Sequence, residues 1–275
     1  MIVRIRQYVV LVITLLVVWA SLTVPARAQV VPLELDVPQI AALGIGVLPD
    51  YEGSDDYTMG VAPFFRYTFR GSERYLQLRA NEVSFNVLNM KNFRLGPVLT
   101  YQFARDHVED SVVKHMEDID GTVMGGIFAD YVIRLSSDPR NRLIIGADWQ
   151  VDMGGVNNGN KGGVGVRYWF PIAKPIDIFV GGRMEFASGN YMQTYFGVNG
   201  EDAARTGLPV YNATNGAKNY ALMTGATFYL SPAWALAAGF RYARLLDHAS
   251  DSPIVDKRGS ANQFMGGLGI AYMWQ

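Results

Sequence analysis

Four carboxylates, Asp50, Glu52, Asp55 and Asp56, lie within seven residues and are possible metal ligands. Oxygen ligands at this density suit Ca²⁺, so the segment could bind a divalent cation directly or bridge through one to lipopolysaccharide. The spacing and closing glutamate of an EF-hand are absent from the sequence. We therefore favour a solvated loop and predict neither a metal site nor a cofactor.

The three histidines, His107, His115 and His248, fall in segments that read as loops. His248 has one serine and two aspartates within three residues, the residue types of a serine hydrolase at a barrel rim. Neighbours in one loop do not make a catalytic triad, and the sequence has no Gly-x-Ser-x-Gly elbow. The chain also has no cysteine, which excludes thiol catalysis and a disulfide scaffold. We predict a protein without enzymatic activity, with a rim hydrolase as the minor alternative.

A third set of charged side chains recurs on one face of alternating segments. Such charges could form a selectivity ring for anionic solutes. The alternative, which we favour, is ion pairing across a narrow barrel lumen, because unpaired interior charge is costly. The candidate lumen charges are Arg66, Arg94, Arg134, Arg167, Arg183, Arg241, Asp130, Asp148, Asp152 and Glu185.

The elements that position these residues are strands, because apolar residues recur with a period of two along the chain. In residues 143–152, for example, Ile145, Trp149 and Val151 share one face, and Asp148 and Gln150 lie on the other. A soluble β protein usually carries Lys, Glu and Thr on its polar face, whereas this chain carries Gly, Ala and scattered charges there. This pattern favours a transmembrane antiparallel β-barrel with a crowded interior over a soluble sandwich or barrel.

The links between segments alternate in length, which is typical of short periplasmic turns and longer extracellular loops. Short links are predicted at residues 137–141, 171–175 and 231–232, and long links at 106–120, 153–161, 188–218 and 249–259. Residues 74–88 supply one more pair of strands if the chain turns near Asn81. An even number of strands requires this turn, so we predict an all-β barrel of about 12 strands, with 10 as the nearest alternative.

The N-terminus has the layout of a secretory signal peptide. Arg4 and Arg6 precede an apolar run at residues 8–20, and a small-x-small cleavage site ends at Ala28. An uncleaved membrane anchor is the alternative. We predict a cleaved signal peptide at 1–28, a periplasmic leader at 29–39 and an outer-membrane barrel at 40–275. Removal of the basic leader leaves a mildly acidic chain, which argues against a nucleic-acid partner.

The longest predicted loop, 188–218, carries the aromatic side chains of Tyr191, Tyr195 and Phe196. Loops of this length are usually functional. This loop could fold into the lumen and occlude it, or present aromatic anchors to a partner. We favour occlusion.

Four blocks, spread in order over the predicted barrel, resemble the MipA/OmpV (MltA-interacting protein) family of bacterial outer-membrane proteins. They are residues 48–57 (LPDYEGSDDY), 93–97 (FRLGP), 191–198 (YMQTYFGV) and 251–264 (DSPIVDKRGSANQF). The resemblance implies an outer-membrane barrel in contact with lipid and lipopolysaccharide. It also implies an envelope scaffold that brings a murein transglycosylase and a murein synthase together. A porin-like channel for small solutes is the alternative function, and the sequence leaves the oligomeric state open.

Overall fold

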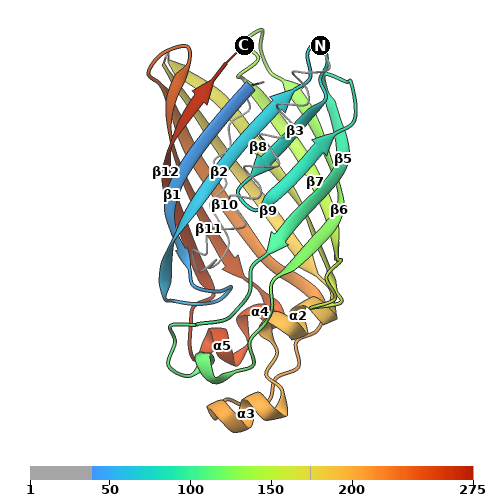
Figure 1. The fold of residues 1–275 in the computed structure, drawn as a ribbon, viewed down its shortest axis with the longest axis vertical. Coiled ribbons are helices and arrows are strands. Elements are labelled where there is room, and N and C mark those ends of the chain that lie inside the picture. Colours follow the sequence, from blue (N-terminus) through green and yellow to red (C-terminus); the bar gives the residue numbers. More distant parts are fainter. Residues whose placement is uncertain (1–38, 174, 275) are drawn as a thin grey trace, which may run out of the picture.

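The computed structural model describes residues 39–173 and 175–274. The predicted signal peptide and almost all of the predicted leader lie outside these residues. The described chain forms a closed barrel in which every strand pairs antiparallel with its neighbours in the chain and β1 pairs with β12 (Figure 1). The prediction of an antiparallel barrel with 12 strands is confirmed, including the turn near Asn81.

Ten of the strands span the wall from one rim to the other, and two are short. The long strands are β1 (Gln39–Pro49), β2 (Tyr57–Thr68), β5 (Phe93–Gln102), β6 (Thr122–Arg134), β7 (Arg142–Asp152), β8 (Asn160–Ala173), β9 (Ile176–Ala187), β10 (Gly216–Tyr229), β11 (Trp234–Leu245) and β12 (Asn262–Met273). The short strands are β3 (Tyr75–Arg79) and β4 (Glu82–Asn86), with five residues each.

Helices occur only in the long loops of the described chain. They are η1 (Val113–His115), α2 (Gly189–Phe196), α3 (Gly200–Thr206), α4 (Asp247–Ser250) and α5 (Pro253–Asp256). All of them lie at the end of the barrel opposite to the chain's C-terminus (Figure 1). None of the helices within the described residues is both long and apolar enough to cross a membrane.

The alternation seen in the sequence separates a lipid-facing surface from the lumen. In β12, Phe264, Leu268 and Ile270 are exposed on the outside, whereas Met265 and Ala271 are buried inside. The same holds for Ile145, Trp149 and Val151 of β7. In a soluble protein such apolar exposure would be a liability, but on a barrel it forms the belt that faces the acyl chains.

By the rule that periplasmic turns are short and extracellular loops are long, the end that carries the helices is extracellular. The links at 50–56, 103–121, 153–159, 188–215 and 246–261 lie at this end, and we call the four of them other than 153–159 together the extracellular cap. The turns at 69–74, 87–92 and 135–141 lie at the other end, near Gln39 of β1 and Met273 of β12, and we call them the turn platform.

Candidate functional site

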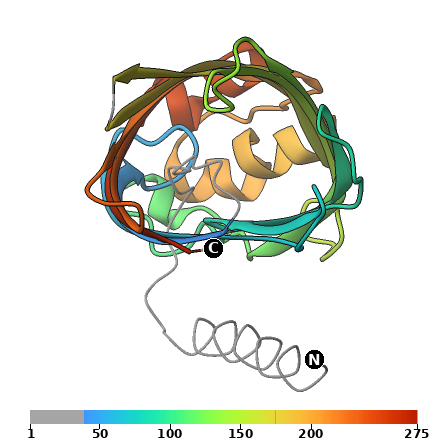
Figure 2. The same cartoon turned by 90° about the horizontal axis from the view of Figure 1, so that it is seen from above.

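The extracellular cap contains the largest apolar core described in the molecule. Side chains from all four cap loops pack together there, among them Tyr51, Val113, Phe196 and Ile254. The N-terminal and C-terminal parts of the cap are also joined by the carboxylate of Asp110, which lies 2.7 Å from the Arg258 guanidinium. Burial raises the pKa of Asp110, but the hydrogen bonds from Arg258 and from the amides of Val113 and Val112 together outweigh burial and hold the pKa below its ordinary value. Figure 2, a view along the barrel, shows helices of the cap lying across the opening.

The acidic segment at 50–56 is folded into this cap, so the prediction of a solvated loop is wrong. Asp50, Tyr51 and Ser54 are buried, and Asp50 Oδ2 accepts a hydrogen bond from the Glu109 amide at 3.0 Å. Asp56 lies in the turn that the loop makes, and its amide donates to Ser54 Oγ at 3.0 Å. Of the four carboxylates, Asp55 is the one exposed to solvent.

The four carboxylates therefore do not converge on one point. No group of three or more acidic or histidine side chains within the described residues is arranged to hold a metal ion. The described loop gives each carboxylate a different environment, and Glu52 forms an ion pair with a buried lysine.

Glu52 and four other side chains form an ion-pair network at the boundary between the cap and the lumen, which we call the lock cluster. Lys218 Nζ lies 2.5 Å from Glu52 Oε1 and 3.3 Å from Glu185 Oε2. Tyr191 Oη of α2 donates to Glu52 Oε2 at 3.2 Å, and its ring lies 5.5 Å from Lys161 Nζ. The cluster thus connects the β1–β2 loop and helix α2 to the walls of β8, β9 and β10.

The buried position of Lys218 results from a bulge. The pairing of β10 with β9 shifts register between Ala217 and Asn219, so Lys218 is the extra residue. Simple alternation would turn neighbouring residues 218 and 219 to opposite faces, yet both are buried, at 1% and 2% exposure. A bulge can re-aim a side chain in this way. Sequence reasoning placed Lys218 at the end of the predicted loop 188–218 and missed its role, because alternation alone does not reveal a bulge.

The lock cluster favours the ionised form of Glu52. Burial raises the pKa of this carboxyl, but the nearby ammonium groups of Lys218 and Lys161 outweigh burial and lower the pKa below its ordinary value of 4.5. The same environment raises the pKa of the Tyr191 phenol, first through burial and then through the negative charge of Glu52. Tyr191 therefore remains a neutral hydrogen-bond donor.

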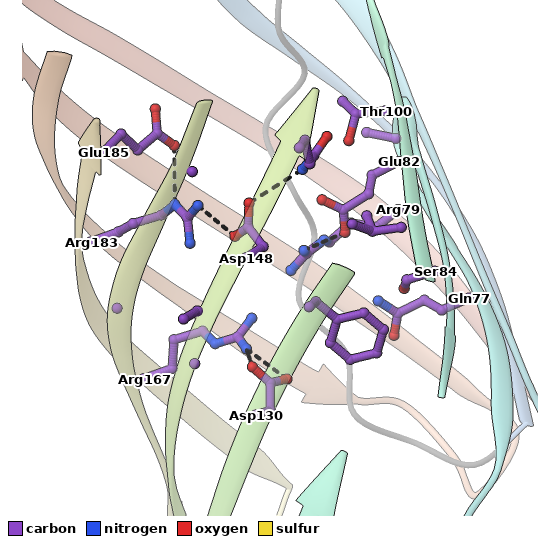
Figure 3. Close-up of a pocket in the computed structure, with 18 of the residues that line it drawn as sticks. Gln77, Arg79, Glu82, Ser84, Thr100, Asp130, Asp148, Arg167, Arg183 and Glu185 are labelled. Carbon is purple, nitrogen blue, oxygen red and sulfur yellow. Dashed lines mark hydrogen bonds and ion pairs between the residues drawn. The ribbon is translucent and has the colours of Figure 1, made fainter. Parts of the chain in front are cut away.

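Further into the lumen, charged side chains pair between strands. Figure 3 shows Arg183 of β9 between Asp148 and Glu185, at 2.6 Å and 3.0 Å. Arg167 of β8 lies 3.4 Å from Asp130 of β6. These five side chains were predicted to face the lumen, and they pair with one another there.

The remaining predicted lumen arginines have different surroundings. The Arg66 guanidinium is buried and lies 3.9 Å from the centre of the Tyr75 ring, and that of Arg94 lies 5.7 Å from the same ring. Arg241 Nη1 lies 3.7 Å from the Met265 sulfur. Tyr75 was not among the predicted site residues, because its role as a platform for two arginines depends on pairing between β2, β3 and β5.

Two predicted lumen charges lie at the rims instead. Arg134, at the last position of β6, is exposed and donates to Asn92 Oδ1 in the turn platform at 2.8 Å. Asp152, at the last position of β7, accepts hydrogen bonds from Thr122 Oγ1 and from the amides of Asn157 and Asn158. Both have the parity of lumen residues, but at a strand end a side chain is close enough to the adjoining loop to organise it.

The aromatic residues of the longest loop are buried. Tyr191, Tyr195 and Phe196 lie on α2 inside the apolar core of the cap, with at most 6% of their surface exposed. Asn157 Nδ2 lies 3.5 Å from Tyr195 Oη, which connects α2 to the β7–β8 loop. This arrangement fits occlusion of the barrel end and leaves these three side chains no surface to offer to a partner.

The histidines do not form a triad. The nearest partner of the His248 ring is Tyr211, whose Oη lies 3.3 Å from Nδ1. Ser250 Oγ instead donates to the carbonyl of Asp247 at 2.9 Å, as expected in a short helix. His107 lies beside Asp106 and is largely exposed.

On the periplasmic side of the cap, the lumen contains a cavity of about 270 Å³. Gln77, Ser84 and Thr100 line it together with the paired charges (Figure 3). Over the whole lining of the cavity, basic side chains outnumber acidic ones. The cavity is large enough for several waters or one small polar solute.

The chain was compared with known proteins. Its residues 41–274 match the family model of the MltA-interacting protein MipA. The curated MltA-interacting proteins of Escherichia coli (strain K12) and Shigella flexneri are each 34% identical to this chain over 74 residues. That alignment covers 27% of this chain and 29% of each relative, so the chain spans less than a third of the relatives' length in these matches.

Two solved structures are similar to this chain at low sequence identity. The NanC porin has a TM-score of 0.48 at 9% identity, over 85% of this chain and all of the porin. An outer membrane channel from Pseudomonas putida F1 has a TM-score of 0.47 at 10% identity, over 88% of this chain and 97% of the channel. The closed barrel with its apolar outer belt is the architecture of a protein of the bacterial outer membrane. Since the family model covers nearly the whole described barrel, the chain belongs to the MltA-interacting protein MipA family.

Proposed function

We propose that this chain is a non-enzymatic envelope scaffold that binds a murein transglycosylase, and through it a murein synthase, on its periplasmic face. The name of the Escherichia coli relative, MltA-interacting protein, is the reason to look for such a partner. The observation that carries the proposal is the order of the turn platform, which is the surface that this barrel offers to periplasmic proteins.

Hydrogen bonds between separate turns hold the platform in one shape. The Glu73 amide donates to Asn89 Oδ1 at 2.8 Å, and Arg74 Nε donates to the Val87 carbonyl at 2.9 Å. Arg134 connects the next strand pair to the same surface through Asn92. A surface that is already ordered loses less conformational entropy when a partner binds. Short turns can therefore support docking when they are bonded to one another.

The same surface carries a second fixed group. Arg140 lies between two carboxylates, 2.7 Å from Asp138 Oδ2 and 3.0 Å from Asp177 Oδ1. The hydrogen bond to Asp138 raises the pKa of Arg140 above its ordinary value. The guanidinium thus remains charged and pinned beside the β8–β9 turn, which extends the ordered surface to four adjoining strands.

A charge-reversal pair tests the proposal. Arg70 and Lys91 are exposed in the turn platform, and Lys114 and Lys257 are exposed in the extracellular cap. We expect the Arg70→Glu, Lys91→Glu variant to recover several-fold less transglycosylase after mild crosslinking in the envelope, because rim charges steer association. The matched variant Lys114→Glu, Lys257→Glu should recover as much as the unmodified chain. Equal recovery by both variants, or no transglycosylase with the unmodified chain, would remove the scaffold proposal.

A porin-like channel for small anionic solutes is the second candidate, and the lumen cavity with its excess of basic side chains is the observation that favours it. Recordings from planar bilayers separate the two candidates. A plugged scaffold should show no steady conductance, whereas a channel should show open events selective for anions. A variant lacking residues 188–215 gives the reference for an uncovered lumen.

A further inference from the structure

The wall of the barrel is incomplete in its extracellular half between β2 and β5. Strand β3 pairs with β2 only from Phe64 to Thr68, and the hairpin then turns at Ala80 and Asn81. Residues 57–62 of β2 pair with β1 on one side, and on the other side no strand of the described chain pairs with them. Figure 1 shows β3 stopping short of the level that β1 and β2 reach.

The gap has a defined frame, and we call it the β2–β5 window. Its edge on the periplasmic side is the tip of the β3–β4 hairpin. This tip is anchored to β5, because the Tyr101 amide donates to the Asn81 carbonyl at 2.9 Å and Asn81 Nδ2 donates to the Tyr101 carbonyl at 2.7 Å. Its edge on the extracellular side is the segment that follows β5 from residue 103 and reaches the β1–β2 loop, where the Glu109 amide donates to Asp50. Residues 57–62 and the end of β5 form the two sides.

The outer border of the window is apolar and aromatic. Tyr57, Met59 and Val61 are 45%, 71% and 48% exposed on one side. On the other side, Tyr101 is 37% exposed and packs edge-on against Phe103, with 5.2 Å between the ring centres. Tyrosines at a barrel rim mark the level where acyl chains meet head groups. The window therefore opens at the outer-leaflet interface.

The inner border of the window is polar and built from small residues. Thr58, Gly60 and Ala62 turn to the lumen on β2, so that no large side chain of this strand stands in the gap. The edge on the periplasmic side carries the Arg79–Glu82 ion pair, at 2.7 Å, and we call this pair the sill. Figure 3 shows it facing the cavity. Ala80, Asn81 and Gln102 of the frame line the lumen cavity themselves.

The backbone amides and carbonyls at the window also need hydrogen-bond partners. The Pro63 carbonyl accepts from the Ala80 amide at 2.7 Å, so it points toward the hairpin. Residues two apart in a strand turn their amides and carbonyls to the same edge, so Tyr57, Met59 and Val61 direct theirs into the window. Unpaired backbone groups are strongly disfavoured in hydrocarbon, so an open edge is tolerated only beside water or a polar ligand.

We propose that the β2–β5 window is a lateral binding site for a membrane amphiphile, with its apolar chain on the outer border and its polar head group on the sill and the backbone edge. The window has an apolar border facing the bilayer, a polar border facing the lumen and, between them, a backbone edge that no strand of the described chain pairs with. These features match the two halves of a phospholipid. This role goes beyond scaffolding, because it connects the lumen to the outer leaflet. It does not depend on any periplasmic partner.

The test uses the protein in vesicles that contain a phospholipid with a photoactivatable diazirine in its acyl chain. A second preparation carries the diazirine in the head group instead. After illumination, we expect the head-group probe to form adducts on lumen-facing residues of the window, at Thr58, Gly60 or Gln102, and the acyl-chain probe to label the lipid-facing belt. Lumen-facing Gln150, which lies behind a continuous wall, serves as the internal control and should carry none. Adducts confined to the lipid-facing belt would overturn the proposal.

A variant that fills the window sharpens this test. Two residues inserted before Ala80 and two after Asn81 lengthen β3 and β4 while they preserve the alternation. We expect at least a tenfold loss of adducts on Thr58, Gly60 and Gln102, with unchanged labelling of the outer belt. Unchanged lumen adducts in this variant would also overturn the proposal.

A second measurement does not require the longer hairpin to fold. The chain has no cysteine, so Thr58→Cys and Gln150→Cys each provide a single site for a nitroxide label. We expect the label at position 58 to collide more often with oxygen, which concentrates in the bilayer, than the label at 150. Equal oxygen accessibility at the two positions would contradict a lateral opening.

Discussion

The two ends of the barrel are held by different forces. The extracellular cap has an apolar core of buried side chains from four loops, together with the buried ions of the lock cluster. The turn platform is held by exposed hydrogen bonds, such as those of Asn89 and Arg134. The largest water-excluding core forms where the long loops meet, and the apolar clusters inside the barrel wall are smaller. We therefore expect large substitution effects in the cap and small ones on the platform.

The largest effect is expected for Lys218→Met. This change leaves Glu52 and Glu185 buried without the ammonium that both contact. Removing one partner of a buried pair costs about 3–5 kcal/mol, so the cap should open far more often. Hydrogen exchange of residues 188–215 measures this opening. The exposed Lys257→Met is the matched control, and equal protection in the two variants would mean that the lock cluster does not hold the cap.

Met192→Ala tests the apolar part of the cap. Met192 of α2 is fully buried, so truncation should lower the free energy of cap opening by about 2–5 kcal/mol. Met59→Ala, in a position that is 71% exposed to lipid, should change it little. Limited proteolysis of the cap loops compares the two. A larger loss for Met59 would reverse the assignment of inside and outside.

Acid should weaken the cap through Glu52. The folded state lowers the pKa of this carboxyl, so the stabilisation is complete above the ordinary value of 4.5 and is lost as the pH falls through the lower pKa of the folded state. Cap protection should therefore be constant from about pH 7 to about 5 and decline below about 4.5. Hydrogen exchange corrected for intrinsic rates measures this. Asp110 has the same direction of shift and adds to the decline, so Glu52→Gln should reduce the pH dependence without abolishing it.

The smallest effect is expected on the platform. Asn89→Ala removes two exposed hydrogen bonds, to Ser72 Oγ and the Glu73 amide, so the loss should be about 0.5–1.5 kcal/mol at most. Exchange of the amides in residues 69–74 should rise while the cap remains unchanged. A loss as large as that of Lys218→Met would erase the contrast between the two ends.

Much of the barrel could be predicted from the sequence. Alternation identified the lipid-facing residues of β7 and β12, and link lengths identified which loops share an end. Alternation also placed five charged side chains in the lumen, those of Arg167, Arg183, Asp130, Asp148 and Glu185. Alternation failed where its assumption fails, at the bulge that turns Lys218 inward and at the strand ends that give Arg134 and Asp152 to loops.

The acidic segment shows the other limit. Asp50, Glu52, Asp55 and Asp56 read as a solvated loop because local composition carries no information about what folds over it. Three of the partners that bury it, Glu109, Lys218 and Gln263, are between 59 and 210 residues away in the chain. Such contacts follow from closure of the barrel, which brings the loops of distant strands to one rim.

The sequence by itself determined which surface of this protein faces lipid and which faces the lumen. Because side chains in a strand alternate with a period of two, the order of apolar and small residues is enough to specify a sheet with one face in lipid and one in a lumen. The tertiary structure decided how the lumen is closed, which charges pair and where the wall is left open. These depend on register, on the bulge in β10 and on the short β3–β4 hairpin, which only the pairing of strands around the whole barrel brings together.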